Sequence, residues 1–173
     1  MSTYMDKRLI WFEKLYDTHA DAIWRHFYHR LGDKERAKEL MQEVFLKTWQ
    51  YVMQGKTIEH EKAFLYRIAK NLFINEIRTK KRETSLDSLE DEGFEIKDEN
   101  DMTSTHAEHK ELMERLGMIK DSYRTVLVMR YIDDLPVKEI ASILDENETN
   151  ISMRIKRGIE ALKQTYERRP QPS

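Results

Sequence analysis

Basic side chains near the end of the chain are the residues best placed to do chemistry, and that chemistry is the binding of nucleic acid. Ile151, Ile155 and Ile159 recur at helical spacing and define an apolar stripe. The opposite face carries Ser152, Met153, Arg154, Lys156, Arg157 and Lys163. Arginine and lysine donate hydrogen bonds to phosphates and to guanine edges, so this face suits DNA. An ordinary helical hairpin with a solvated charged face is the alternative interpretation.

A shorter helix is predicted directly before this one. Pro136 suits a first helical position, where its missing N–H costs nothing, and Ile140 and Leu144 follow on one face. Residues 145–147 prefer turns and caps, and Asn147 is a good N-cap for the second helix. Two short helices around a tight turn, the second basic on its free face, are typical of a helix-turn-helix.

A second basic surface is predicted on a helix at residues 61–82. Its exposed positions carry Arg67, Lys70, Asn71, Asn75, Arg78, Lys80, Lys81 and Arg82. Bases at a helix C-terminus are favoured by the helix dipole, which is one explanation for them. Together with the two amides, they also suit a phosphate track beside hydrogen bonding to base edges.

Histidine pairs are the other candidate for chemistry, but neither pair has the further ligands that a metal site needs. His26 and His29 are three residues apart, as are His106 and His109, but no third ligand stands near either pair. The chain has no cysteine and no HExxH motif. We therefore expect no metal, no cofactor, no catalytic residue and no small-molecule substrate.

The distribution of charge divides the chain. The net charge is −2, but residues 1–82 carry 17 Lys and Arg against 11 Asp and Glu. Residues 83–111 carry 2 against 11, and residues 151–173 carry 6 against 2. Two basic surfaces are thus separated by an acidic connector, which is consistent with nucleic-acid binding because local patches set that binding.

Apolar periodicity predicts an all-α fold with two small helical domains joined by an acidic, flexible linker. Only 5 glycines and 3 prolines interrupt the sequence. Domain boundaries are expected at 1–82, 83–107 and 108–173, with three helices in the first domain and four in the second. In the first, Gly32 closes a helix that starts near residue 6, and Asp33 caps the next. In the second, Ser122 is a possible cap.

Targeting signals are not apparent. The sequence has no run of 18 apolar residues and no signal-peptide pattern at its beginning. Together with the absence of cysteine, these observations lead us to expect a cytoplasmic protein.

Three stretches in this order resemble the extracytoplasmic-function (ECF) sigma factors of bacterial RNA polymerase. Residues 32–49, GDKERAKELMQEVFLKTW, are similar to the family's regions 2.1–2.2. Residues 64–82, FLYRIAKNLFINEIRTKKR, are similar to regions 2.3–2.4, and residues 123–162 are similar to region 4. The resemblance implies a sigma factor that binds core polymerase and directs promoter recognition in DNA-templated transcription initiation, with no catalytic activity of its own.

The resemblance also implies roles for particular residues. Core-polymerase contacts with the β′ clamp and the β flap fall on Leu40, Gln42, Glu43 and Arg124. The minus-ten element falls to the loop at residues 56–62, which receives a flipped base, and to the helix after it: Lys56, Lys62, Asn71, Asn75, Arg78, Lys80, Lys81 and Arg82. The minus-thirty-five element falls to Ser152, Met153, Arg154, Lys156 and Arg157. Gly158, where the family has another small residue, costs helix stability of about 1 kcal/mol relative to Ala.

The implied partners are core RNA polymerase, promoter DNA and, as in many relatives, an anti-sigma factor. Two other classes of protein would account for parts of the sequence. A stand-alone dimeric helix-turn-helix regulator would explain residues 123–162 but not the two earlier stretches. A pure interaction module, such as an anti-sigma decoy, would not need the exposed bases at residues 78–82 and 154–157.

Overall fold

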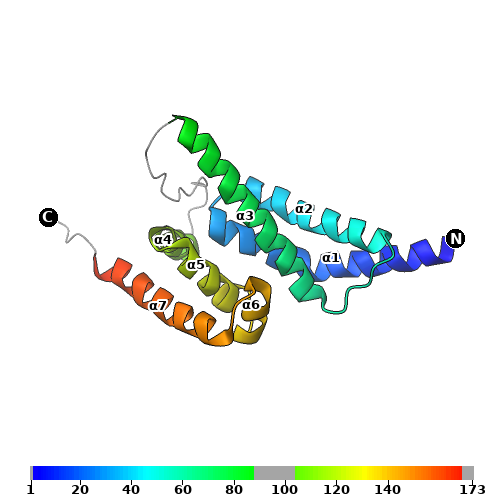
Figure 1. Cartoon of the computed structure of the whole chain (residues 1–173). Helices are drawn as coiled ribbons and strands as arrows, with labels where there is room; N and C mark the ends of the chain where they lie inside the picture. Colours follow the sequence, from blue (N-terminus) through cyan, green and yellow to red (C-terminus); the bar gives the residue numbers. More distant parts are fainter. Residues whose placement is uncertain (1, 88–103, 169–173) are drawn as a thin grey trace.

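A computed structural model of the chain describes residues 2–87 and 104–168 (Figure 1). Within these ranges the secondary structure is helical, and the prediction of an all-α fold is confirmed. The part of the acidic linker at residues 88–103 lies outside the described residues.

The first three helices form the N-terminal bundle: α1 (Ser2–Leu31), α2 (Lys34–Met53) and α3 (Glu61–Asp87). Gly32 has φ +69°, and the Asp33 side chain accepts a hydrogen bond from the Arg36 backbone N–H at 3.0 Å, as predicted for a helix end followed by an N-cap. Ile23, Phe27 and Leu65 are fully buried and form the centre of the bundle core. Both α1 and α3 are longer than their apolar patterns suggested.

The remaining helices form the C-terminal unit: α4 (Ser104–Met118), α5 (Asp121–Leu127), a π-helical segment η1 (Val128–Ile132), α6 (Val137–Leu144) and α7 (Glu148–Glu167). The prediction of Ser122 as a cap is wrong, because α5 already begins at Asp121. The prediction of a helix-turn-helix is confirmed in geometry: Asp145 is left-handed at φ 56°, and the Asn147 side chain caps α7.

Gly158 has a structural reason on α7. A Cβ at this position would lie 3.2–3.4 Å from the branched end of Leu127, which is itself buried. Glycine therefore allows α7 to lie close to α5, and this close packing offsets the low helix propensity of glycine.

The two units are packed against each other rather than held apart. In Figure 1, α6 lies beside the first half of α3, and contacts join these two helices as well as α1 and η1. A continuous set of buried apolar residues runs through both units. The two helices predicted to carry basic surfaces, α3 and α7, therefore belong to units that share one core.

Candidate nucleic-acid and protein interfaces

The free face of α7 carries most of the side chains predicted to read a DNA duplex. Ser152, Met153, Lys156 and Arg157 are exposed, and Met153 retains 46% of its accessible surface. Asn147 caps the helix, which begins at Glu148, and its Oδ1 accepts from the Asn150 backbone N–H at 2.8 Å. A helix with a free polar face and an apolar methionine at its centre can contact both phosphates and a thymine methyl.

Arg154 differs from its neighbours on α7 because it is half-buried and already paired. Its two terminal nitrogens donate to the two carboxylate oxygens of Glu146 at 2.8 and 2.6 Å. Such a bidentate pair uses the donor geometry that would otherwise bind a guanine edge. The sequence placed Arg154 among the exposed readers, and it did not predict the role of Glu146.

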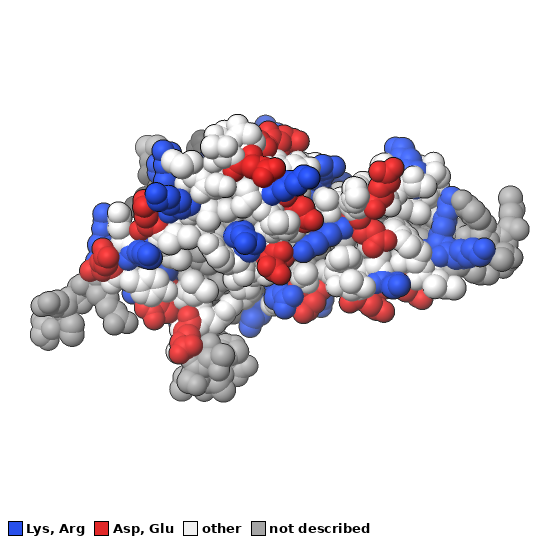
Figure 2. All heavy atoms as spheres, turned by 90° about the horizontal axis from the view of Figure 1, so that it is seen from below, with Lys and Arg blue, Asp and Glu red and all other residues white. Residues whose placement is uncertain are grey.

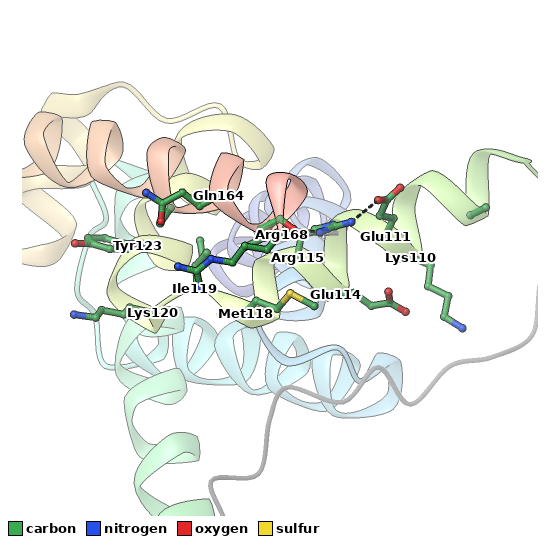
Figure 3. A pocket seen from close by; sticks show the side chains of 13 residues that line it. Lys110, Glu111, Glu114, Arg115, Met118, Ile119, Lys120, Tyr123, Gln164 and Arg168 are labelled. Carbon is green, nitrogen blue, oxygen red and sulfur yellow. Dashed lines mark hydrogen bonds and ion pairs between the residues drawn. The ribbon is translucent and has the colours of Figure 1, made fainter. Parts of the chain in front are cut away.

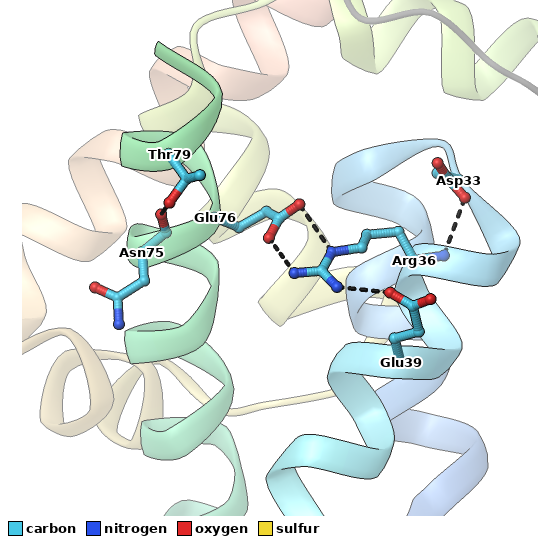
Figure 4. Close-up of polar contacts among 6 residues, drawn as sticks. All are labelled: Asp33, Arg36, Glu39, Asn75, Glu76 and Thr79. Atoms are coloured by element: carbon cyan, nitrogen blue, oxygen red, sulfur yellow. Dashed lines mark hydrogen bonds and ion pairs between the residues drawn. The ribbon is translucent and has the colours of Figure 1, made fainter. Parts of the chain in front are cut away.

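The outer face of α3 keeps the predicted strand-binding residues accessible. The exposed side chains on it are Asn71, Asn75, Arg78, Lys80, Lys81 and Arg82. In Figure 4, the Asn75 amide projects from α3 on the side away from α2, while the next residue, Glu76, turns toward α2. One side of α3 is thus used for packing and the other is open.

The packed side of α3 is held by a charged clamp to α2 (Figure 4). Arg36 donates to both carboxylate oxygens of Glu76 at 2.9 and 2.6 Å and to Glu39 at 2.6 Å. The hydrogen bond from Arg36 lowers the pKa of Glu76, and its partners raise the pKa of Arg36. The clamp fixes the direction in which α3 presents its outer face.

Arg67 and Lys70, which also lie on α3, point toward the C-terminal unit. Arg67 donates to the Ser142 hydroxyl at 2.7 Å, and Lys70 reaches the Ile143 carbonyl and the Asp145 carboxylate, both at 3.1 Å. The open basic track on α3 is therefore shorter than the sequence suggested, and in this arrangement it does not include these two side chains.

The loop between α2 and α3 borders a small cavity. Gly55 has φ +82°, and the cavity of about 300 Å³ is lined by Trp11, Lys56 and neighbouring residues. Lys56 Nζ lies 4.9 Å from the centre of the Tyr51 ring. Lys62, at the other end of the predicted base-binding loop, is half-buried and reaches the Asp133 carbonyl at 3.4 Å. The cavity thus combines cationic and aromatic groups that can hold a base.

The exposed face of α2 carries part of the predicted protein interface. Gln42 is exposed, and Glu43 is half-buried and lies 3.7 Å from Lys47. Leu46 lies one helical turn after those two residues and therefore on the same face, and 55% of its surface is exposed. Leu40, in contrast, is only 2% exposed and belongs to the core. The i, i+4 spacing from Gln42 could have identified Leu46 as the apolar part of this face.

Arg124 is engaged by backbone carbonyls of both units, since its Nη1 donates to the Arg30 carbonyl of α1 at 3.4 Å. Its guanidinium donates to the carbonyls of Leu116 at 2.8 Å and of Gly117 and Ile119 at 3.2 Å, where α4 ends. Burial lowers its pKa. Arg124 therefore helps to fix the end of α4 and joins it to the end of α1.

A groove of about 870 Å³ lies between α4, α5 and α7 (Figure 3). Met118, Ile119 and Tyr123 supply its apolar surface, and Met118 is 67% exposed. Lys120 and Arg168 add positive charge to its lining, and in Figure 3 the Arg168 side chain extends between Gln164 and Met118. The combination is typical of a surface that binds an apolar segment of another protein.

Buried polar side chains join the two units where no sequence pattern pointed. His26 Nδ1 on α1 lies 2.6 Å from Asp133 Oδ2 just after η1, and these side chains are 0% and 1% exposed. Arg30 is also buried, donates to the Thr125 hydroxyl at 2.7 Å and stacks over Phe73. Burial lowers the pKa of Arg30 to about 10. Partners 95 and 107 residues apart leave no local signal in the sequence.

Charges of both signs are mixed on the face in Figure 2, and neither sign forms a continuous patch there. Within residues 2–87 and 104–168, no group of three metal-binding side chains is present, and no helix has the length and apolar character needed to cross a membrane. The candidate sites are therefore surfaces on α2, α3 and α7, together with the cavity beside Lys56 and the groove between α4, α5 and α7.

Family models match both units. The model for Sigma-70 region 2 matches residues 15–83, and the model for Sigma-70, region 4 matches residues 109–162. Among characterised relatives, the chain is 31% identical over 164 residues to the ECF RNA polymerase sigma factor SigW of Bacillus subtilis, covering 88% of this chain and 87% of that protein. It is 25% identical over 154 residues to SigL of Mycobacterium tuberculosis, covering 88% and 87% respectively.

Solved structures share the fold. The sigma factor RpoE of Bartonella quintana, crystallised with the anti-sigma factor NepR, has a TM-score of 0.65 at 14% identity, over 98% of this chain and 100% of that one. CnrH, solved with the cytosolic domain of CnrY, has a TM-score of 0.66 at 18% identity, over 90% and 87%. The arrangement of helices is thus similar to that of sigma factors in complexes.

Proposed function

Because the chain belongs to the ECF sigma factors of bacterial RNA polymerase, we propose that its two helical units divide promoter recognition between them. As a member of this family it binds core RNA polymerase and promoter DNA and directs transcription initiation. The observation that carries this function is the match to both sigma regions, in order, along one chain. A stand-alone regulator would not require the region 2 match.

The N-terminal bundle, residues 1–82, is proposed to bind core polymerase through α2. Gln42 and Glu43 supply polar contacts to the β′ clamp, and Leu46, one helical turn further along α2, supplies an apolar contact. Leu40 supports this face from the core. An exposed leucine flanked by polar residues fits a protein interface, whose centre is apolar and whose rim is polar.

The same bundle is proposed to hold the minus-ten strand on α3. The cavity beside Lys56 would receive an extruded base, and Asn71 and Asn75 would contact the strand along the open face. The last part of α3 supplies the phosphate contacts, through Arg78, Lys80, Lys81 and Arg82. Lys62 belongs to this surface once it is released from Asp133. Aromatic and cationic groups next to a basic track are what single-strand capture requires.

The C-terminal unit, residues 108–173, is proposed to read the minus-thirty-five duplex with α7. Ser152, Met153, Lys156 and Arg157 already face solvent, and Arg154 joins them when DNA replaces Glu146. The groove in Figure 3 is proposed to bind the β flap, with Arg124 acting indirectly by fixing the end of α4. The linker, residues 83–107, connects the two units.

Three further parts of the proposal concern the whole chain. We infer that it has no catalytic activity of its own, because the chemistry of RNA synthesis belongs to the core enzyme. It acts in the cytoplasm, where that enzyme works. An anti-sigma factor is a proposed additional partner, since the structurally similar RpoE was crystallised with one.

Two pairs of substitutions test the division of roles. Replacing Lys156 and Arg157 with alanine should abolish promoter-specific run-off transcription and leave binding to core polymerase intact. Replacing Gln42 and Glu43 should weaken core binding itself. Unchanged transcription in both double variants would refute the residue assignments, and Glu167→Ala, at an exposed position near the end of α7, is a matched control.

Gel shifts with and without core polymerase separate this function from a dimeric regulator. Specific binding only with the core enzyme is expected. Tight, palindrome-dependent binding by the chain alone would favour the regulator instead.

A further inference from the structure

A cavity of about 310 Å³ lies where the two helical units meet. It is separate from the cavity beside Lys56 and from the groove between α4, α5 and α7. Its lining comes from the end of α1, from α3, from the first part of α5 and from the helix-turn-helix. Cavities of this size at the junction of two units commonly bind small molecules, and the side chains around them determine which class of molecule fits.

Arg30, at the end of α1, brings a buried positive charge to this cavity. Its side chain is 4% exposed, and Nη2 donates to the Thr125 hydroxyl at 2.7 Å. The Asp121 carboxylate lies 3.8 Å from Nη2 and is 54% exposed, so solvent screens much of its charge. The Arg30 Nε is buried and has no hydrogen-bond partner among the residues that the structure describes. A buried charge with an unused donor is costly, and an anion in the adjoining cavity would reduce that cost.

Two further cations line the same cavity, Lys70 of α3 and Arg154 of α7. Lys70 uses two of its three N–H donors for partners at 3.1 Å, and the third can point to a ligand. Arg154 is paired with Glu146 and contributes charge rather than donors. Among the described lining residues, the three cations outnumber the two carboxylates, which belong to Asp121 and Glu146. The cavity therefore favours an anion, and the several acceptor oxygens of a phosphate match arginine and lysine donors.

One face of α3 supplies an apolar wall beside these cations. Ile74 and Ile77 follow Lys70 by four and seven residues, so all three lie on the same side of the helix. Ile74 is 43% exposed and Ile77 is half-buried, so both offer apolar surface to a ligand. A ring that covers this surface gains from its burial while a charged group on the same molecule reaches the cations. The cavity thus fits a molecule with one anionic end and one apolar end.

From this combination we propose that the cavity binds a nucleoside phosphate. The phosphate lies between Arg30 and Lys70, where it accepts their unused donors, and the base packs on Ile74 and Ile77. The Ser122 side chain also lines the cavity and supplies a hydroxyl for the sugar or the phosphate. This inference is independent of promoter recognition, because a chain that failed to direct transcription could still bind the nucleotide.

Titration calorimetry of the full chain tests the proposal. The probes are ADP, GDP, CDP and UDP, with inorganic phosphate and the four nucleosides as half-ligands. At least one diphosphate should bind at one site per chain and about tenfold or more tightly than either of its halves, because only the whole molecule covers the apolar wall and reaches the cations. The absence of binding by all four diphosphates would overturn the proposal, as would phosphate or a nucleoside that binds as tightly as the best of them.

Substitutions on α3 test the two ends of the site separately. Lys70→Gln removes one charged donor and should weaken nucleotide binding about tenfold or more. Ile74→Glu places a carboxylate on the apolar wall and should abolish binding. Lys38→Gln removes an exposed cation of α2, outside the cavity, and is the matched control with unchanged affinity. Equal losses in Lys70→Gln and Lys38→Gln would show general attraction by positive charge and would overturn the proposal.

The Ile74 variant also protects the test against misfolding. Ile74 is 43% exposed and glutamate is a strong helix former, so the fold should survive, as circular dichroism would show. If Lys70→Gln unfolds, Ile74→Glu decides the question by itself. Nucleotide binding that persists in the folded Ile74 variant would place the ligand elsewhere and refute the assignment of this cavity.

Discussion

Truncating Leu46 to alanine should weaken binding to core polymerase without weakening the fold. Leu46 is 55% exposed on α2, one helical turn after the polar residues assigned to the clamp contact. Because alanine is a strong helix former and the side chain is largely in solvent, stability should change by less than about 0.5 kcal/mol. The loss should therefore appear only when the partner is present.

The size of the loss follows from the exposed fraction. Fully burying a leucine side chain contributes about 1.5–3 kcal/mol, and only about half of Leu46 remains for a partner to cover. The expected loss is about 0.8–1.5 kcal/mol, which raises the dissociation constant about fourfold to tenfold, since roughly 1.4 kcal/mol corresponds to a factor of ten.

The assay is titration of labelled protein with core polymerase, beside thermal unfolding of the protein alone. Ile10→Ala on α1 is the matched control, because Ile10 is 66% exposed but lies outside the α2 face. Wild-type affinity in the Leu46 variant would refute the reasoning, as would an equal loss in the Ile10 control.

Three further predictions concern the stability of the free chain. Arg36→Ala should lower the free energy of unfolding by only about 1 kcal/mol at pH 7, because Arg36 is partly exposed and its ion pair is screened by solvent. Since Arg36 lowers the pKa of Glu76, this difference from wild type should shrink as the pH falls below about 4.5, which denaturant titrations would measure. Burial lowers the pKa of His29, so on acidification the unfolded chain binds a proton there before the folded chain does, and stability should fall as the pH drops through about 6.5. His29→Gln should reduce this dependence of the melting temperature on pH, and an unchanged dependence would contradict this account. Gly158→Val should cost about 1–3 kcal/mol in chemical denaturation through its clash with Leu127, and a neutral effect would mean that α5 and α7 can move apart.

Local signals predicted the helix ends that depend on neighbours in sequence. Asp33 and Asn147 were identified as caps because an N-cap needs only its own side chain and a backbone N–H three residues on. Ser122 was wrongly chosen for the same reason: the start of α5 is set by the end of α4, which Arg124 fixes through carbonyls. The π-helical segment after α5 leaves no apolar spacing that distinguishes it from an α-helix.

The surfaces could be predicted only as far as exposure follows from helical periodicity. Met153 and Asn75 lie on free faces as their spacing indicated. Arg154 and Lys70 have equally favourable positions on their helices, yet each is paired with an acid of the turn at residues 145–146. The Lys70 pair joins the two units and the Arg154 pair joins α7 to the turn before it, so both depend on how helices pack in three dimensions, and a single sequence carries no pattern for that.

The pairing of Arg154 with Glu146 has a consequence for how the protein behaves among non-promoter sequences. A lone phosphate must compete with a carboxylate that already binds both terminal nitrogens, whereas a guanine edge offers two coplanar acceptors in return. If α7 reads DNA as proposed, random genomic DNA should therefore retain it only briefly. Shorter dwell times at wrong positions would then leave more of the factor free to scan the chromosome.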